Sequence, residues 1–213
     1  MGLDDVGEEL RYFVLERLGS SLDKVHRPMA KAQLGCVGEQ LVTILERLHR
    51  RGLVHCDVNP ENVCWAWTPD GGDDASSVRI IDLGMVKKVQ GRPQVGCQAG
   101  KPNFVGTHYF RGEIYSFRDD LEAVGLIVAD LCGAALPWAK CTYPKDLQAM
   151  LKLREESPDK YLNGSPSKRA IAEYLKVVQG LEGGKTPTID YDALRGMFTK
   201  LRGGSREGAG CDQ

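Results

Sequence analysis

Apolar residues recur at three- and four-residue spacing between about Lys31 and Arg51, and charged residues occupy other positions of this stretch. Such a period places the apolar side chains on one face of an α-helix, so the pattern predicts a long amphipathic helix over 31–51. Gly52 follows where a left-handed residue commonly ends a helix, and we expect the helix to stop there. A second stretch, 119–131, is apolar nearly all round and predicts a buried central helix.

Shorter patterns predict strands. Residues 12–15 form an apolar run that is typical of a short buried strand. Residues 63–67 and 78–81 alternate like the two arms of a hairpin, and the Gly- and Asp-rich segment 70–73 supplies its turn. Strands this short, beside several helices, favour a mainly α fold that is α+β overall.

The rest of the chain divides into connectors, short helices and polar ends. Residues 16–22 predict a connector in which Ser20 or Ser21 caps a short helix. Residues 85–104 are basic, contain Gly and Pro and show no period, which predicts a mobile loop. Further helices are expected at about 145–155, 167–180 and 190–201, and the polar segments 1–9 and 203–213 are expected to be disordered.

Composition narrows the class of protein. A chain of 213 residues with 42% hydrophobic residues can bury one core, so a single domain is expected over about 10–202. A net charge of -1 gives no general attraction to nucleic acid or to an anionic membrane. No signal peptide and no apolar stretch of membrane-spanning length is visible. The seven cysteines form no Cys-x-x-Cys pair, which favours reduced thiols in a cytoplasmic or nuclear protein.

Two acids and one amide follow the ends of these elements. Asp57 stands two residues after His55, and Asn62 comes five residues after Asp57. Asp82 opens the sequence Asp82-Leu83-Gly84, directly after the second arm of the hairpin. Phosphoryl transfer needs a carboxylate at the attacking hydroxyl and oxygen ligands for Mg²⁺ across the phosphates. Asp57, Asn62 and Asp82 are the residue types that this chemistry requires.

The order of these residues resembles the catalytic loop of protein kinases, His-Arg-Asp followed after four residues by Asn, and then the metal-binding Asp-Phe-Gly. Over about residues 10–202 the chain resembles the C-terminal lobe of a eukaryotic-type protein kinase. Three features are similar to the casein kinase 1 and vaccinia-related kinase group. They are the hinge-like segment 15–22, the helix start 118–125 with Leu136-Pro137-Trp138 after it, and the segment 190–195.

For nucleotide and metal, the resemblance implies ATP and Mg²⁺ as cofactors. Leu15 corresponds to the residue that guards the adenine pocket, and the backbone of Glu16 and Leu18 to the groups that bond the adenine edge. Asn62 and Asp82 correspond to the Mg²⁺ ligands.

For catalysis, the resemblance implies that Asp57 is the catalytic base and that Thr107 lines the substrate-docking loop beside it. It also implies that Asp120 ties the central helix to the backbone of the catalytic loop. His55 is expected to pack beneath that loop rather than to carry a proton. The expected partner is a protein substrate, acidic or phosphorylated, which the basic loop would contact.

Several residues depart from the kinase pattern. Asn59 stands where Ser/Thr kinases place the lysine that neutralises the transferring phosphate, Cys56 replaces the usual Arg, and Leu83 replaces the usual Phe. Loss of the lysine is expected to weaken transition-state stabilisation by about 2.7–4 kcal/mol, by analogy with the loss of one oxyanion-hole donor. No Gly-x-Gly-x-x-Gly loop or Val-Ala-Ile-Lys strand precedes Tyr12, so we expect the upper lobe to be missing from this chain.

Three functions follow as hypotheses. The first is a Ser/Thr protein kinase, truncated or impaired. The second is a pseudokinase that acts as a binding or scaffold module, which Asn59 and the missing lobe favour. The third is a kinase-like small-molecule phosphotransferase, which segment 190–195 and the Asp-Asp-Leu-Glu helix start argue against. In each case a partner is expected to cover the apolar face that the missing lobe would leave.

Overall fold

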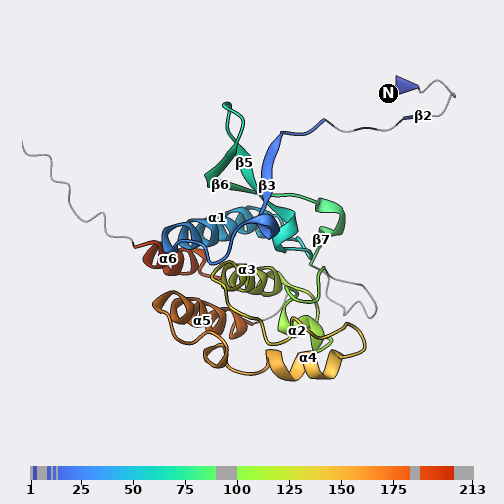
Figure 1. Ribbon diagram of the computed structural model, residues 1–213. Coiled ribbons are helices and arrows are strands. Elements are labelled where there is room, and N and C mark those ends of the chain that lie inside the picture. The colour runs from blue at the N-terminus through green and yellow to red at the C-terminus, as the bar shows by residue number, and fades with distance from the viewer. Residues whose placement is uncertain are drawn as a thin grey trace, which may run out of the picture.

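The long helix expected from the apolar period is α1 (Lys31–His49). It belongs to a computed structural model that describes residues 2–3, 9–10, 12, 14–89, 100–182 and 188–203. Gly52 lies three residues beyond the end of α1 with φ +71°, which confirms the left-handed stop. Figure 1 shows α6 (Tyr191–Arg202) beside α1, and the two helices pack against each other.

Helix α3 (Phe117–Leu131) is the centre of the molecule, as its sequence predicted. Every residue of the helix except Asp130 is buried. It lies between α1 and α5 (Pro166–Gln179) in Figure 1 and packs against both. A capping box between Ser116 and Asp119 satisfies backbone groups at its N-terminus. The helix is therefore a buried platform against which the rest of the fold is positioned.

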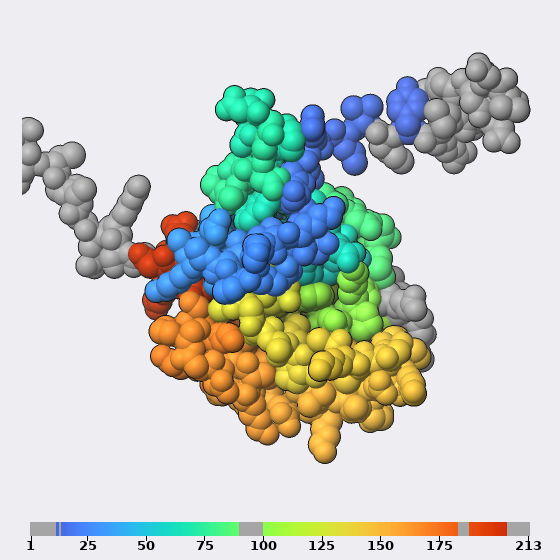
Figure 2. Space-filling view, in the orientation of Figure 1, coloured from blue at the N-terminus to red at the C-terminus, as the bar shows by residue number. Residues whose placement is uncertain are grey.

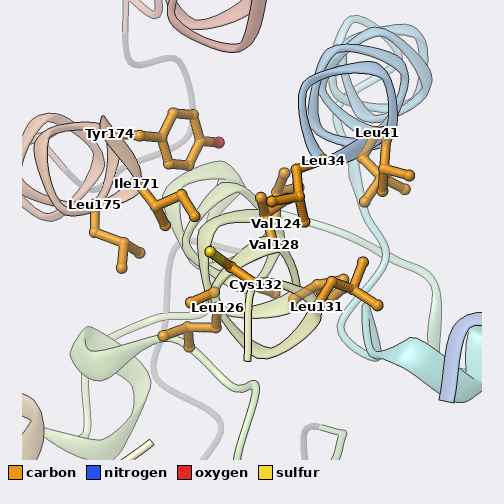
Figure 3. Packing of buried hydrophobic residues seen from close by; sticks show 14 of the residues in the cluster. Leu34, Leu41, Val124, Leu126, Val128, Leu131, Cys132, Ile171, Tyr174 and Leu175 are labelled. Atoms are coloured by element: carbon orange, nitrogen blue, oxygen red, sulfur yellow. The ribbon is translucent and has the colours of Figure 1, made fainter. Parts of the chain in front are cut away.

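The core is formed where these three helices meet. Figure 3 shows Leu34 and Leu41 of α1 facing α3, while Ile171 and Leu175 of α5 approach α3 from another side. All four side chains are at most 1% exposed. Full burial of a leucine or isoleucine side chain contributes about 1.5–3 kcal/mol, so the packing of these four side chains around α3 stabilises the fold substantially.

Three antiparallel strands, in the order β3, β5 and β6, lie on the side of α1 that faces away from α3 (Figure 1). In the space-filling view of Figure 2 the hairpin residues project above α1. The hairpin of β5 (Val63–Trp67) and β6 (Asp73–Ile80) confirms the alternating pattern, with Val63 opposite Ile80. Strand β3 (Leu18–Ser21) lies in the segment expected to be only a connector. It forms because Leu18 pairs with Ala66 of β5, a contact between residues far apart in the chain.

A second ladder changes the expectation for the basic loop. Strand β7 (Lys87–Lys88) pairs with β4 (Leu53–Val54), so part of 85–104 is extended structure and not loop. Residues 90–99 of that segment, with Arg92, lie outside the described residues.

The remaining elements are short. They are α2 (Thr107–Phe110), α4 (Leu147–Arg154), and the 3-10 turns η1 (Leu22–Lys24), η2 (Pro60–Asn62), η3 (Leu83–Met85) and η4 (Pro158–Lys160). Among them α4 confirms the helix expected at about 145–155, whereas α2 was not expected. Within the segment expected to be disordered, β1 (Gly2–Leu3) pairs with β2 (Glu9–Leu10). The rest of 1–8 and the residues after Gly203 lie outside the described residues, and the absence of an upper lobe stays a prediction.

The expected buried strand at 12–15 is wrong. Val14 is 88% exposed and Leu15 is 83% exposed, neither residue is in a strand, and Phe13 lies outside the described residues. Figure 1 shows this segment at a distance from the helices, approaching them only where it enters β3. Among the described residues no strand pairs with 14–17. An apolar run does not reveal whether a neighbouring strand exists to bury it.

Two glycines on the packed helices provide a matched test of the α1–α6 contact. A Cβ at Gly38 would lie 2.4 Å from the ring of Phe198, which is buried against Tyr174, whereas a Cβ at Gly196 would meet nothing within 4 Å. We expect Gly38→Ala to lower the free energy of unfolding by about 1–3 kcal/mol through overpacking. Gly196→Ala is expected to raise it by about 0.5–1 kcal/mol through helix propensity. Urea denaturation measures both, and equal effects would contradict the packing described.

Candidate active site

Asp120 holds the backbone of the loop that follows β4. Its Oδ2 accepts from His55 N at 2.7 Å, and its Oδ1 accepts from Cys56 N at 3.1 Å. His49 Nε2 and the hydroxyl of Tyr115 each lie 2.9 Å from this carboxylate. These contacts confirm the predicted tie between the central helix and the catalytic loop. Burial alone would raise the pKa of Asp120, but the bonds from His49 and His55 hold that pKa below its ordinary value.

His55 takes the packing position expected for it. Its side chain is 1% exposed, and its Nδ1 accepts a hydrogen bond of 3.4 Å from the backbone N of Asp57. A ring so buried supports the loop from beneath.

Two amides hold the carboxylate of Asp57. Asn62 Nδ2 donates to Asp57 Oδ2 at 2.8 Å and to its carbonyl oxygen at 3.0 Å. Asn59 Nδ2 donates to Asp57 Oδ1 at 2.7 Å. Asn59 also begins η2, because its Oδ1 accepts from Glu61 N at 3.0 Å. The two amides thus orient the carboxylate of Asp57, the residue expected from the sequence to be the catalytic base.

The hairpin brings Asp82 to the same place. Ile81 N donates to the carbonyl oxygen of Asn62 at 2.9 Å, so the next residue, Asp82, emerges beside Asn62. Asp82 is exposed and left-handed, with φ +60°, and its Oδ1 accepts from Gly84 N at 3.1 Å. The predicted set Asp57, Asn62 and Asp82 is therefore gathered at one end of β5 and β6.

The oxygen atoms at this end suit a hard cation. Mg²⁺ prefers carboxylate and amide oxygens and retains several waters. Both hydrogen bonds of the Asn62 amide use its nitrogen, and among the described residues no hydrogen bond occupies Asn62 Oδ1 or Asp82 Oδ2. The donor set thus fits the Mg²⁺ that the motif implies. No cluster of three or more His, Cys, Asp or Glu residues with metal-binding geometry occurs in the described part of the chain.

The hinge residues lie at the start of β3. Glu16 forms an exposed ion pair of 3.6 Å with Arg79 on β6, and the guanidinium of Arg17 lies 3.9 Å from the centre of the Trp67 ring. Leu18 is paired with β5, whereas Leu15 is exposed. The segment 16–18 is therefore anchored to the hairpin, and its outer edge is open to solvent.

Among the hydrogen bonds of the described residues, none joins Thr107 to Asp57. Thr107 is 3% exposed, its Oγ1 donates to Glu122 Oε1 at 2.6 Å, and its N donates to Glu122 Oε2 at 2.8 Å. In this segment it is Lys101 whose backbone N donates to Asp57 Oδ1 at 3.3 Å, and the role expected for Thr107 stays a prediction.

A buried arginine fixes the segment after Lys101, and sequence reasoning missed it. Arg154 of α4 is 1% exposed, donates to the carbonyl oxygens of Pro102 and Val105, and lies between the rings of Phe110 and Trp138. Burial lowers the pKa of Arg154 to about 10, so the group stays charged at neutral pH. No local signal at position 154 identifies partners about 50 residues away.

The comparisons with known proteins agree with this geometry. The model of the protein kinase domain matches residues 7–178. The chain belongs to the protein kinase domain family. It is 27% identical over 206 residues to casein kinase 1-like protein HD16 of Oryza sativa, which covers 88% of this chain and 28% of that protein.

Two further relatives to which the chain is similar are a casein kinase I and a vaccinia virus kinase. Casein kinase I homolog 2 of Saccharomyces cerevisiae is 26% identical over 202 residues, covering 88% of this chain and 36% of that protein. The B1 kinase of vaccinia virus (strain Ankara) is 24% identical over 206 residues, covering 87% of this chain and 66% of the viral protein. The chain thus spans about a third of the length of the first two relatives.

No helix in the described residues has the length and apolar character needed to cross a membrane.

Proposed function

We propose that this chain acts as a protein kinase of casein kinase 1 type, which transfers the γ-phosphoryl group of ATP to a serine or threonine hydroxyl of a protein. The observation that carries the proposal is the hydrogen bonding of Asn62, whose side chain holds Asp57 and whose backbone holds the strand end that leads to Asp82. Membership of the protein kinase family supports this reaction over a small-molecule phosphotransferase.

In the proposed reaction Asp57 accepts the proton of the substrate hydroxyl. The hydroxyl oxygen forms a bond to the γ-phosphorus while the bond from that phosphorus to the β–γ bridging oxygen breaks, and ADP leaves with the electron pair. Asn62 and Asp82 would hold Mg²⁺, which neutralises charge on the phosphates. The two amides on Asp57 keep its carboxylate oriented for the hydroxyl.

The nucleotide base would lie against the segment that enters β3. Leu15 would border the adenine, and backbone groups of Glu16 and Leu18 would bond its edge. The anchoring of 16–18 by Arg79, Trp67 and β5 supports this role, because a hinge that binds through its backbone has to be held in place.

The departures favour slow turnover. Asn59 donates to Asp57 but carries no positive charge for the transferring phosphate. This observation favours the second candidate function, a pseudokinase that binds nucleotide or protein and does not transfer phosphate. Nucleotide binding and phosphate transfer therefore have to be measured separately.

The proposed partners are proteins. Lys101 lies at Asp57, and Lys87 and Lys88 form β7, which pairs with the strand before the Asp57 loop; these lysines would suit an acidic or phosphorylated substrate. A second partner is proposed on the apolar side chains that are exposed around the site, Val14, Leu15 and Leu83. Free cysteines such as Cys56 and Cys64 support a reducing compartment, the cytoplasm or nucleus.

The test is a thermal-shift titration of the full chain with ATP, with and without Mg²⁺. Binding at 100 times the Kd stabilises a protein by about 2.7 kcal/mol, which raises the Tm of a domain of this size by roughly 5–11 °C. We expect a shift that needs Mg²⁺ and that Asp82→Asn abolishes. The matched control is Asp70→Asn, in the exposed turn of the same hairpin. This variant should keep the Mg²⁺-dependent shift.

Transfer is then measured with γ-labelled ATP and casein, the acceptor that the names of the relatives suggest. Label in casein that disappears in Asp82→Asn supports the kinase. A Mg²⁺-dependent shift without label supports the pseudokinase. If ATP produces neither a shift nor label, the kinase proposal is wrong, and of the two candidates only a pseudokinase that binds protein remains.

A further inference from the structure

Lys101 lies at Asp57, a position that the residues around it in the sequence did not predict. Its backbone N donates to Asp57 Oδ1 at 3.3 Å, and Asn59 Nδ2 donates to the same oxygen at 2.7 Å. Two donors on one oxygen lie close to each other, so the start of the Lys101 side chain is beside the tip of Asn59. Asn59, which stands where Ser/Thr kinases place a positively charged lysine, thus has the lysine Lys101 as its neighbour.

Gly100 makes this approach feasible. It has φ +41°, and a Cβ at this position would lie 2.7 Å from Asp57 Oδ1 and 2.9 Å from the carbonyl oxygen of Cys56. Only glycine lets the chain pass so close to the carboxylate, and the passage delivers Lys101 to it.

The backbone of Lys101 is held firmly on its other side. Its carbonyl oxygen accepts from Phe104 N at 2.9 Å and from Val105 N at 3.2 Å. Trp138 Nε1 donates to the carbonyl oxygen of Asn103 at 3.0 Å, and the buried Arg154 binds the carbonyls on both sides of that residue. The position of Lys101 at Asp57 therefore follows from the packed core and not from a chance conformation of a surface loop.

The ammonium group of Lys101 is directed at the loop 55–62, where an exposed ion pair holds it. It pairs with Glu61, which lies between Pro60 and Asn62, and the two side chains are 43% and 55% exposed. Exposed ion pairs of this kind are weak, and a lysine ammonium is a point charge on a flexible stem. A triphosphate beside Asn62 offers it a stronger partner than one exposed carboxylate.

We propose that Lys101 supplies the positive charge at the transferring phosphoryl group that Asn59 cannot supply. The inference rests on the kinase function proposed above and adds to it a lysine from outside the catalytic loop. Lys101 keeps its protons throughout, and no bond to it forms or breaks. Its ammonium neutralises charge on the γ-phosphate as the phosphoryl group moves to the substrate oxygen.

Nucleotide affinity tests the inference without turnover. ADP lacks the γ-phosphate, so Lys101→Met should weaken binding of Mg²⁺-ATP by about tenfold or more, as expected for a lost charged contact, and change ADP binding less than twofold. Glu61→Gln removes the competing carboxylate and should tighten ATP binding. The dissociation constants of Mg²⁺-ATP and of ADP are both measured by calorimetry on the full chain. The matched control is Lys160→Met, which removes the lysine of another exposed pair, with Glu156.

A charge swap provides the second measurement. If the two positions serve one phosphate, Asn59→Lys combined with Lys101→Met should restore the ATP affinity that Lys101→Met loses, together with any label transferred to casein. Equal losses of ATP and ADP affinity, a loss that Asn59→Lys does not restore, or a rise only in the KM for casein would overturn the inference and leave the kinase proposal standing. If the unmodified chain binds neither nucleotide, the kinase proposal itself fails, and the inference fails with it.

Discussion

Asp120→Asn is expected to lower the free energy of unfolding by about 3–5 kcal/mol, as for the removal of one partner from a buried ionic network. Asp120 accepts from two backbone amides, and His49 and Tyr115 also reach its oxygens. An asparagine offers one acceptor oxygen and turns an NH₂ group toward the remaining donors, so some of them stay buried without a partner. Equilibrium denaturation in urea at pH 7 measures the loss.

The control for this prediction lies on the same helix. Asp130 pairs with Arg27 where both side chains are more than a quarter exposed, so Asp130→Asn should cost less than about 1 kcal/mol. A comparable loss for the two variants would show that any acid on α3 matters equally and would contradict the special role of Asp120.

The difference in stability between the unmodified chain and Asp120→Asn is also expected to depend on pH. Because the pKa of Asp120 is held below its ordinary value of 3.8, the stability that its charge contributes is present above that value. It is lost as the pH falls below 3.8 toward the lower pKa of the folded state. The difference in stability between the unmodified chain and Asp120→Asn should therefore be constant near neutral pH and narrow below about pH 4.

The periodic parts of the fold could be predicted from the sequence because local pattern and tertiary packing agree there. The apolar face of α1 and the nearly all-apolar α3 are the faces that meet in the core. Strand β3 and the exposed residues Val14 and Leu15 could not be predicted, because strand formation depends on whether a distant partner such as Ala66 is present.

The candidate site divides in the same way. Asp57, Asn62 and Asp82 were found because their spacing in one loop and one hairpin largely determines their proximity. Lys101 was not recognised as the neighbour of Asp57, because its position depends on contacts from Trp138 and Arg154 that no local sequence signal reports. The position of Lys101 therefore could not be predicted because it depends on long-range contacts, although a lysine is a residue type that suits a phosphate site.

Asp57→Asn has the largest expected effect on activity. If Asp57 is the base, its loss should reduce kcat for phosphate transfer to casein by about 10²–10⁴-fold, the usual contribution of a general base. The reduction should fall on kcat, because Asp57 contacts the substrate hydroxyl and not the nucleotide base. Asn59 and Asn62 both donate to this carboxylate, so a measurement of Tm on the same sample has to accompany the kinetics.

Nucleotide binding separates a loss of chemistry from a loss of fold in this variant. Mg²⁺-ATP should bind Asp57→Asn with a Kd within about threefold of the unmodified value, since the proposed oxygen ligands, Asn62 Oδ1 and Asp82, remain. The control is Asp159→Asn, an exposed acid whose partner Lys176 lies on α5, for which neither kcat nor Kd should change. Asp57→Asn that keeps its nucleotide affinity and still phosphorylates casein at the full rate would remove Asp57 from the reaction. Phosphate transfer by this chain would then depend on positioning and charge alone, with Lys101 as the group to examine next.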